Sequence, residues 1–271
     1  MHSPNLKSAL DQPQIVGTKL RKECEAGRLC GPFLCPLFPN FFCFALGIVP
    51  KKDPSEFRLI QHLSYPHCTS VNHNIPDTHS SVHYASISDA IAVLKSLGAG
   101  CFLAKTDIKS AFRIILIHPS DFPLLGMKWD NQFYFDVCPP MGLSSSCQIF
   151  EAFSSSLEWI AVHRFAASGV LHILDDFLFI ARTEEQCRTD LSNFLRMCDY
   201  LGVPIAQEKT CGPSQVMQFV GITLNSINQK ARLPEDELQK CRLILESFCK
   251  RRKVTLRELH SLIANLYNRI N

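Results

Sequence analysis

The fold of this chain is decided by the stretch LHILDDFLFIA, residues 171–181. Two apolar runs flank the pair Asp175-Asp176, and this pattern predicts a β-hairpin with both acids at its tip. Two adjacent carboxylates within so much apolar sequence are costly unless another charge cancels theirs. A divalent cation is the simplest answer, and carboxylate-only ligation suits Mg²⁺. For the Asp pair alone, a solvated hairpin tip is the alternative.

A third acid strengthens the metal interpretation. Asp107 follows the apolar strand Cys101–Ala104. If this strand lies beside the hairpin, Asp107 converges with Asp175 and Asp176 on one end of a sheet. Three such carboxylates supply the ligands of a two-metal site, which activates an attacking oxygen and stabilises the leaving one in phosphoryl transfer. We therefore predict that the three acids are metal ligands.

The surrounding patterns predict the neighbouring elements. Ser86 or Ser88 can cap a helix that Gly98 closes. Before this helix, the sequence predicts a short helix around Lys19–Ala26, and loops and short strands over 31–85. After it, the predicted elements are a turn at 107–112, a second strand at Arg113–Ile117 and a helix over 144–165. Three further helices are predicted: one from the capping box of Thr183 with Gln186 to Gly202, one that starts at Pro234, and one that starts at the capping box of Thr255 with Glu258.

Composition limits the class of protein. The 271 residues are 46% hydrophobic and 20% charged, so the chain can bury a core as one large domain or two modest ones. A formal net charge of +3 excludes a histone-like binder, and any nucleic-acid site must be a local basic patch. The 13 cysteines are odd in number and irregularly spaced, which favours reduced thiols. With no evident signal peptide, we expect an intracellular protein of the cytoplasm or nucleus.

Residues 31–50, GPFLCPLFPNFFCFALGIVP, are uncharged and as long as a membrane span. Pro32, Pro36 and Pro39 would break the helix that a lipid-facing backbone needs. We therefore expect an extended, buried segment and no membrane span. The His and Cys residues of 67–83 fit no structural zinc signature, and we expect a solvated loop there.

Seven sequence blocks in one order carry a family resemblance. They are LGIVPKKDPSEFRLIQHLSYP (46–66), LAKTDIKSAFRIILIHP (103–119), CPPMGLSSSCQIFEAF (138–153), HILDDFLFIA (172–181), LGVPIAQEKT (201–210), FVGITL (219–224) and ARLPEDELQK (231–240). With these blocks the chain resembles reverse transcriptases, and most closely the reverse transcriptase domains of DIRS-like (tyrosine-recombinase) retrotransposons.

The resemblance implies an α+β fold. Its centre would be a right-hand polymerase palm, an antiparallel sheet with helices on one face, accompanied by fingers and a truncated helical thumb. The implied boundaries are a partly disordered lead-in at 1–30, the fingers with the segment that enters them at 31–100, the palm at 101–225, and part of the thumb or connection helices at 226–271.

The resemblance also implies roles for single residues. Asp107, Asp175 and Asp176 would hold two Mg²⁺ ions, with Mn²⁺ as a substitute, and Lys209 would join them as a catalytic residue that assists the departing pyrophosphate. Among the nucleotide-binding residues, Lys51 and Arg58 would contact the triphosphate, and the Ile108 carbonyl would help to hold a metal ion. Phe112 would lie under the sugar, where its ring excludes a 2′-hydroxyl. Gly142 would line the nucleotide and template pocket. The hairpin that grips the primer end would contain Phe219, Val220 and Gly221.

The implied function is RNA-directed DNA polymerisation, in which a primer is extended on an RNA or DNA template with deoxynucleoside triphosphates. Some residues depart from the family pattern: Ile173 replaces a usual aromatic residue and Cys147 a usual proline. We also expect the family's ribonuclease H domain to be absent from this chain. The alternative is therefore a catalytically inactive, retroelement-derived relic that binds nucleic acid. Such a relic would bind primer–template in a salt-sensitive way, even without the three acids.

Overall fold

The computed structural model describes residues 3–51, 53, 56–251 and 253–270, and of residues 264–270 it describes the backbone. The chain divides into two compact units, and each unit takes two separate stretches of sequence. Unit 1 comprises Met1–His83 and Ser110–Phe153, and unit 2 comprises Tyr84–Lys109 and Ser154–Asn271. Helix α4 (Ser146–Phe165) contributes residues to both units.

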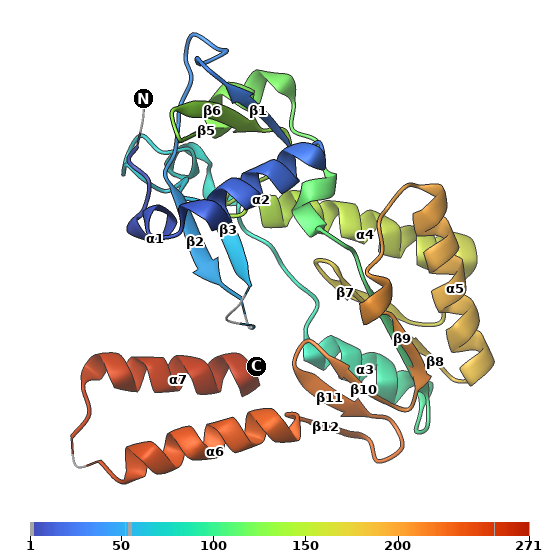
Figure 1. The fold of residues 1–271 in the computed structure, drawn as a ribbon. Helices are drawn as coiled ribbons and strands as arrows, with labels where there is room; N and C mark the ends of the chain where they lie inside the picture. The colour runs from blue at the N-terminus through green and yellow to red at the C-terminus, as the bar shows by residue number, and fades with distance from the viewer. Residues whose placement is uncertain (1–2, 52, 54–55, 252, 271) are drawn as a thin grey trace. The chain divides into compact units, whose positions relative to one another are not determined.

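Unit 1 holds two small antiparallel sheets (Figure 1). One sheet has the strand order β1-β6-β5, and the other is the β2-β3 hairpin. The helices and strands of this unit are α1 (Lys7–Leu10), α2 (Pro13–Glu25), β1 (Leu29–Phe33), β2 (Leu46–Pro50), β3 (Phe57–Gln61), β5 (Gly126–Trp129) and β6 (Gln132–Asp136). Its 3-10 helices are η1 (Asn72–Asn74), η2 (Asp77–His79), η3 (Ala111–Ile114) and η4 (Pro119–Leu125).

Helix α2 is longer than the short helix predicted around residues 19–26. It begins at Pro13, whose fixed φ and missing N–H suit the first helical position. Val16 and Leu20, four residues apart on one face, are buried against Leu46 and other residues of the same core cluster. This packing extends the helix through a stretch in which β-branched residues and Gly17 lower the helix propensity.

The apolar segment 31–50 is only half buried. Residues 41 and 43–48 are buried, Phe42 is partly buried, and Phe41 packs with Phe133 and Phe135 of β6. Residues 34–37 are exposed, so the expectation of a buried segment holds for the second half alone. Among the described helices, none combines the length and the apolar character that crossing a membrane requires.

Unit 2 is built around a four-stranded antiparallel sheet with the strand order β7-β8-β4-β9. Its strands are β4 (Phe102–Asp107), β7 (Val170–Ile173), β8 (Asp176–Ala181) and β9 (Cys211–Ser214). A smaller antiparallel sheet consists of β10 (Val216–Phe219), β11 (Ile222–Asn225) and β12 (Lys230–Arg232). The helices are α3 (Ile87–Leu97), α5 (Glu184–Tyr200), the 3-10 helix η5 (Gln207–Lys209), α6 (Glu235–Cys249) and α7 (Leu256–Ile270).

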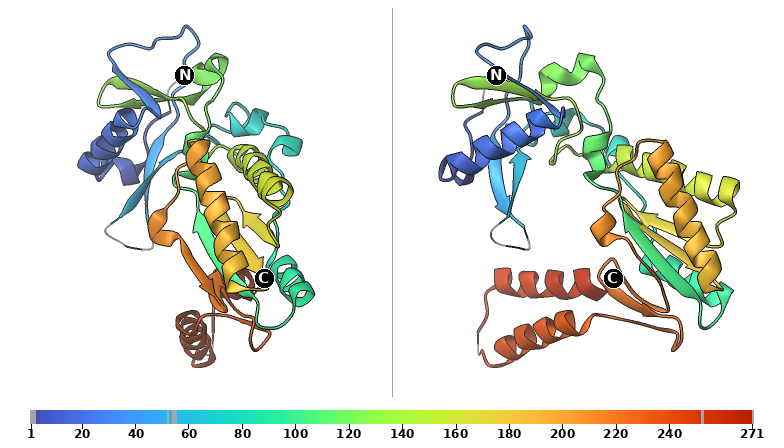
Figure 2. Two further views of the ribbon diagram at one scale, coloured as in Figure 1. Left: turned by 90° about the vertical axis from the view of Figure 1, so that its right-hand side faces the viewer. Right: turned by 45° about the vertical axis from the view of Figure 1, so that its right-hand side comes forward.

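Strand β8 is covered on both faces. Phe177 and Phe179 point to α5, where their rings lie 4.6 and 5.1 Å from the ring of Phe194, measured between centroids. Leu178 and Ile180, on the opposite face, pack with residues of α3 and of the β10-β11 hairpin. Figure 2 shows α5 lying along the sheet. Helix α3 thus packs on the face of the sheet opposite α5, because a strand that is apolar on both sides is stable only when both faces are buried.

The clearest sequence patterns are confirmed. The predicted hairpin over 171–181 forms as β7 and β8. Helix α3 starts at a reciprocal capping box of Ser86 with Asp89 and ends at Gly98, which has a φ of 98°. Helix α5 is capped by the Thr183 side chain, which accepts a hydrogen bond from the Gln186 amide.

The strand predicted at Arg113–Ile117 is wrong. After β4 the chain passes through Ser110, with a left-handed φ of 70°, into the 3-10 helix η3. The apolar run Ile114–Ile117 resembles a strand, but the Arg113 guanidinium binds acceptors from distant parts of unit 1. Side-chain bonds of Arg113 therefore hold this segment, where the pattern had indicated a sheet ladder.

Candidate active site

Asp107 and Asp176 face each other across two neighbouring strands. Asp107 is the last residue of β4, Asp176 is the first residue of β8, and the two are partners in the antiparallel register. Asp175 lies in the turn before β8, and its carbonyl accepts a hydrogen bond from the Ile108 amide at 2.9 Å. The structure therefore brings the three predicted acids together at one end of the large sheet of unit 2.

A tight turn places Asp175 and Asp176 at this end. Ile173 pairs with Asp176, so only Leu174 and Asp175 connect the two strands. Leu174 adopts a left-handed φ of 54°, as two-residue hairpin turns require. The apolar residues on either side are drawn into the core, and this leaves the two carboxylates at the rim of the sheet.

The three carboxylates repel one another in a partly buried site. Asp107 is 4% exposed. Burial, followed by repulsion from Asp175 and Asp107, raises the pKa of Asp176 to about 6. Burial also raises the pKa of Asp175, and Asp107 adds to the effect. The site thus holds more negative charge than its surroundings offset, which is the condition that a bound divalent cation relieves.

Lys209 compensates part of this charge. Its ammonium lies 2.6 Å from the Oδ2 atom of Asp107, and this hydrogen bond raises the pKa of Lys209. The backbone explains the placement: the Ala206 amide donates to the Asp107 carbonyl at 2.9 Å, and the Lys109 amide donates to the Pro204 carbonyl at 2.8 Å. The segment before η5 is therefore fixed to the end of β4, and it carries Lys209 to the acids.

The donor set at this end of the sheet suits Mg²⁺, because it consists of carboxylate oxygens without a thiolate or imidazole. Within the described ranges, however, no group of three or more His, Cys, Asp or Glu side chains is arranged as a ready metal site. The Lys209 ammonium occupies one side of Asp107. Metal binding at the three acids thus stays a prediction, supported by donor chemistry and by the excess of negative charge.

The predicted phosphate-binding residues lie on the β2-β3 hairpin of unit 1. Lys51 directly follows β2, and its Nζ atom lies 2.7 Å from a carboxylate oxygen of Glu56. Arg58 is exposed on β3, opposite Val49. One hairpin therefore presents both cations, and Lys51 is paired within it.

Gly142 occupies a position that only glycine can fill. Its φ is +115°, and an added Cβ would lie 2.5 Å from the Gln61 carbonyl oxygen. The Asn72 side chain donates to the Gly142 carbonyl at 2.7 Å and accepts from the Ser144 amide at 2.9 Å. These contacts fix the loop that carries Gly142 against the end of β3.

Phe112, the predicted sugar-contacting residue, lies in η3. Its ring meets the ring of Phe150 in α4 edge-on, with 5.6 Å between centroids. Phe112 and Gly142 both belong to unit 1.

Residues 49–224 match the reverse transcriptase (RNA-dependent DNA polymerase) family. The chain belongs to this family. The matched range contains the three acids, Lys209 and every predicted nucleotide-binding residue. No curated protein sequence matches the chain.

Solved structures show the same fold. A foamy viral protease-reverse transcriptase (dRH) in complex with dsDNA has a TM-score of 0.72 and 16% identity over 98% of this chain and 41% of that one. A foamy viral protease-reverse transcriptase in complex with dsDNA has a TM-score of 0.69 and 17% identity, over 98% of this chain and 49% of that one. A foamy viral protease-reverse transcriptase in complex with an RNA/DNA hybrid has a TM-score of 0.71 and 16% identity, over 98% of this chain and 31% of that one. The chain thus spans less than half the length of these proteins.

The predicted primer-grip residues lie at the β10-β11 hairpin. Phe219 is buried, with 2% exposure, among core residues of unit 2. Val220 and Gly221 form the turn, with left-handed φ values of 44° and 79°. The Lys105 ammonium donates to the Gln218 carbonyl at 2.8 Å and fixes the hairpin to β4. Of these residues, Val220 has an exposed side chain, whereas the Phe219 ring is withdrawn into the core.

The sequence patterns missed Arg113. Its guanidinium contacts Glu23, Asp136 and three backbone carbonyls within unit 1. The partners are far away in sequence, so no local pattern could reveal the network. The only available signal was a cation between the apolar residues Phe112 and Ile114.

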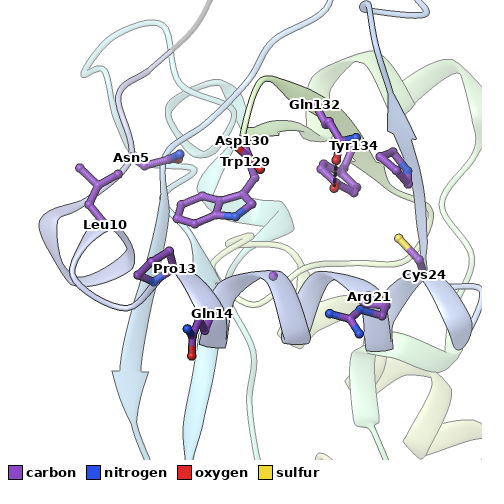
Figure 3. Close-up of a pocket in the computed structure, with 12 residues that line it drawn as sticks. Asn5, Leu10, Pro13, Gln14, Arg21, Cys24, Trp129, Asp130, Gln132 and Tyr134 are labelled. Atoms are coloured by element: carbon purple, nitrogen blue, oxygen red, sulfur yellow. Dashed lines mark hydrogen bonds between the residues drawn. The ribbon is translucent and has the colours of Figure 1, made fainter.

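A pocket of about 740 Å³ in unit 1 is not part of this site (Figure 3). Figure 3 shows Trp129 and Tyr134 on one side, and Pro13 and Arg21 along α2 on the other. None of its twelve lining residues is a residue that the sequence predicted for the site.

Proposed function

We propose that this chain is the polymerase domain of a retroelement reverse transcriptase and catalyses RNA-directed DNA synthesis. The observation that carries the proposal is the convergence of Asp107, Asp175 and Asp176, with Lys209 bound to Asp107. Reverse transcriptase family membership supports it. The seven ordered sequence blocks further support a DIRS-like element as the source.

In this proposal the three acids hold two Mg²⁺ ions, or Mn²⁺ in their place. The ions, when bound, would activate the primer 3′-hydroxyl and stabilise the departing pyrophosphate. Lys209 is protonated at neutral pH, as lysine ordinarily is, and Asp107 raises its pKa further and holds the ammonium beside the acids. In this position it would donate a proton to the leaving group. The Ile108 carbonyl, next to Asp107, is the proposed backbone ligand.

The remaining residues would bind the nucleotide and the primer. Lys51 and Arg58 supply cationic donors for the triphosphate of a deoxynucleotide. Phe112 would lie under the sugar, and Gly142 would line the base pocket. Phe219, Val220 and Gly221 would support the primer end, as part of an RNA or DNA primer–template.

We also propose the family's division of the chain. The fingers would lie within residues 31–100, the palm within 101–225, and the thumb or connection helices within 226–271. The helices α6 and α7 support the last assignment, since both lie beyond the β12 strand. Residues 1–30, proposed as a lead-in, contain α1 and α2.

Primer extension on an RNA template, with deoxynucleotides and Mg²⁺, tests the function. The wild-type chain should extend the primer, and Asp175→Asn/Asp176→Asn should reduce extension by about four orders of magnitude or more. Asp190→Asn is a matched control, since Asp190 is a buried carboxylate of α5 that bonds to Ser168 and Gln186. A folded wild-type chain that binds primer–template but never extends it would refute polymerisation and favour the relic.

A further inference from the structure

Arg113 binds more acceptors than any local pattern suggests. Its Nη1 atom donates to the carbonyls of Cys138 and Pro139 at 3.0 and 3.3 Å. Its Nη2 atom lies 2.6 Å from Asp136 Oδ1, and both Nε and Nη2 approach Glu23 Oε2, at 3.3 and 3.1 Å. The Arg28 carbonyl accepts a further bond at 3.3 Å. One guanidinium thus joins α2, the end of β6 and η3.

These bonds are made in a buried setting. The Arg113 side chain is 12% exposed and that of Asp136 is 5% exposed. A buried guanidinium is stable only when its donors are matched, and here two carboxylates and three carbonyls match them. A lysine could supply the charge, but it lacks the planar fork that reaches several acceptors at once.

The two carbonyls belong to the segment that leads to Gly142. Residues Cys138, Pro139 and Pro140 are buried, and the two prolines have no N–H with which to continue the β6 ladder. Their carbonyls still need donors. Arg113 supplies donors to the carbonyls of Cys138 and Pro139, which lie four and three residues before Gly142.

Arg113 is also the direct neighbour of Phe112. The bonds of the guanidinium therefore anchor the short helix η3 that carries the Phe112 ring, and the same bonds anchor the segment before Gly142. Both residues are parts of the nucleotide pocket under the function proposed above.

We propose that Arg113 is a positioning residue that holds Phe112 and the Gly142 loop in fixed register, and so sets the selection of deoxy- over ribonucleotides. This inference rests on the proposed polymerase function for its kinetic consequence. The holding of the loop is a property of unit 1 alone and can be measured without catalysis.

Four variants test the proposal. Arg113→Gln removes the guanidinium. The double variant Arg113→Gln/Asp136→Asn also removes the guanidinium, but it leaves no buried carboxylate unpaired at position 136 and is therefore expected to fold. Arg113→Lys keeps the charge without the fork. Arg28→Gln is the matched control: the Arg28 side chain also binds Glu23, at 2.9 Å, but is not a donor to Cys138 or Pro139.

The first measurement is amide hydrogen exchange in the Gly142 loop. The Leu143 amide bonds to the Pro140 carbonyl, and the Ser144 amide bonds to Asn72. We expect both amides to exchange about tenfold faster or more in the double variant and in Arg113→Lys, and unchanged in Arg28→Gln. Equal protection in all folded variants would overturn the proposal, whether or not the chain polymerises.

The second measurement is the ratio of kcat/KM for a deoxynucleotide to that for the matching ribonucleotide. We expect the ratio to fall about tenfold in the double variant and in Arg113→Lys, mainly because a displaced Phe112 ring excludes the 2′-hydroxyl less well and the kcat/KM for the ribonucleotide rises. A purely structural role would lower the active fraction and leave the ratio unchanged, and that result would overturn the proposal. If the wild-type chain shows no extension, the proposed function fails, and the exchange result alone decides whether Arg113 holds the loop.

Discussion

At the scale of single residues, the repulsion among Asp107, Asp175 and Asp176 at the end of the sheet lowers the stability of the fold. Asp176 faces Asp107 in the register and follows Asp175 directly, and its pKa rises to about 6. Natural proteins keep such like-charge clusters where a ligand is meant to relieve them. The same conflict between charge and burial made the Asp pair stand out in the sequence.

Replacing Asp176 by Asn should stabilise the protein, and under the proposed function it should also abolish catalysis. Removal of one charge relieves the repulsion that raises the pKa of Asp176. Because the side chain is partly exposed and solvent screens its charge, we expect the free energy of unfolding to rise by about 1–2 kcal/mol. Urea denaturation at pH 7.5 without divalent ions measures the gain. Asp190→Asn should give no gain, since the Asp190 carboxylate accepts hydrogen bonds from Ser168 and Gln186. A less stable Asp176→Asn variant would contradict the electrostatic account.

The gain should depend on pH with a definite sign. The folded-state pKa of Asp176 is raised from 3.8 to about 6, so the folded protein binds the proton more tightly than the unfolded chain. The wild type therefore loses stability, relative to Asp176→Asn, as the pH rises through about 6. The two proteins should differ little near pH 4 and most near pH 7.5. A constant difference over this range would exclude the titration of Asp176 as the cause.

Gly142→Ala should destabilise unit 1 by about 2–4 kcal/mol, since it combines a left-handed φ with a backbone clash at Gln61. Gly202→Ala is the matched control. Gly202 also has a positive φ, 71°, but an added Cβ there meets nothing within 4 Å. Chemical denaturation of both variants separates the clash from the conformational strain. Equal losses would show that the Gln61 contact does not matter.

At the scale of elements, the short-range patterns were the most informative. The hairpin over 171–181, the capping boxes and the glycine stops were predicted because each depends on residues within a few positions of one another. The wrong strand at 113–117 and the full length of α2 depend on contacts with remote residues, which no local window contains. The convergence of the acids was predictable, because strands that flank a hairpin tip end at one sheet edge.

The capping box of α3 offers a prediction at this scale. Ser86 accepts from the Asp89 amide at 3.2 Å, and its own amide donates to Asp89 at 2.7 Å. Ser86→Ala should therefore lower the free energy of unfolding by about 1 kcal/mol. Ser88→Ala, two residues along the same helix, should be neutral or slightly stabilising, because alanine has the higher helix propensity. Thermal denaturation distinguishes them, and a larger loss for Ser88→Ala would move the cap to that residue.

At the scale of the whole molecule, the sequence assigns residues to two units in an interleaved order. The three acids and Lys209 belong to unit 2, while Lys51, Arg58, Phe112 and Gly142 belong to unit 1. Composition alone left one domain or two open, since the count of residues cannot show which segments pack together. The family resemblance supplied the residue roles, and these stay proposals.

Mg²⁺ should act on unit 2 selectively. If the three acids bind it, the free energy of unfolding should rise by about 2–3 kcal/mol at a concentration roughly 100 times the Kd. In hydrogen exchange, protection should increase at the end of β4 and in the β7-β8 turn, and removal of the ion with a chelator should reverse it. Asp107→Asn should abolish the effect. Equal protection of unit 1 and unit 2 in that variant would point to nonspecific binding.

The interleaved order has a consequence for synthesis on the ribosome. β4 is an inner strand of its sheet, with β8 on one side and β9 on the other. β8 starts at Asp176, so the nascent β4 must wait for roughly 70 more residues before its first partner emerges, on the order of ten seconds at ordinary translation speed. During that time both edges of an apolar strand are open to pairing with other chains. Slower elongation between residues 107 and 176 should therefore lower the soluble yield, and co-expressed chaperones that bind extended apolar segments should restore it.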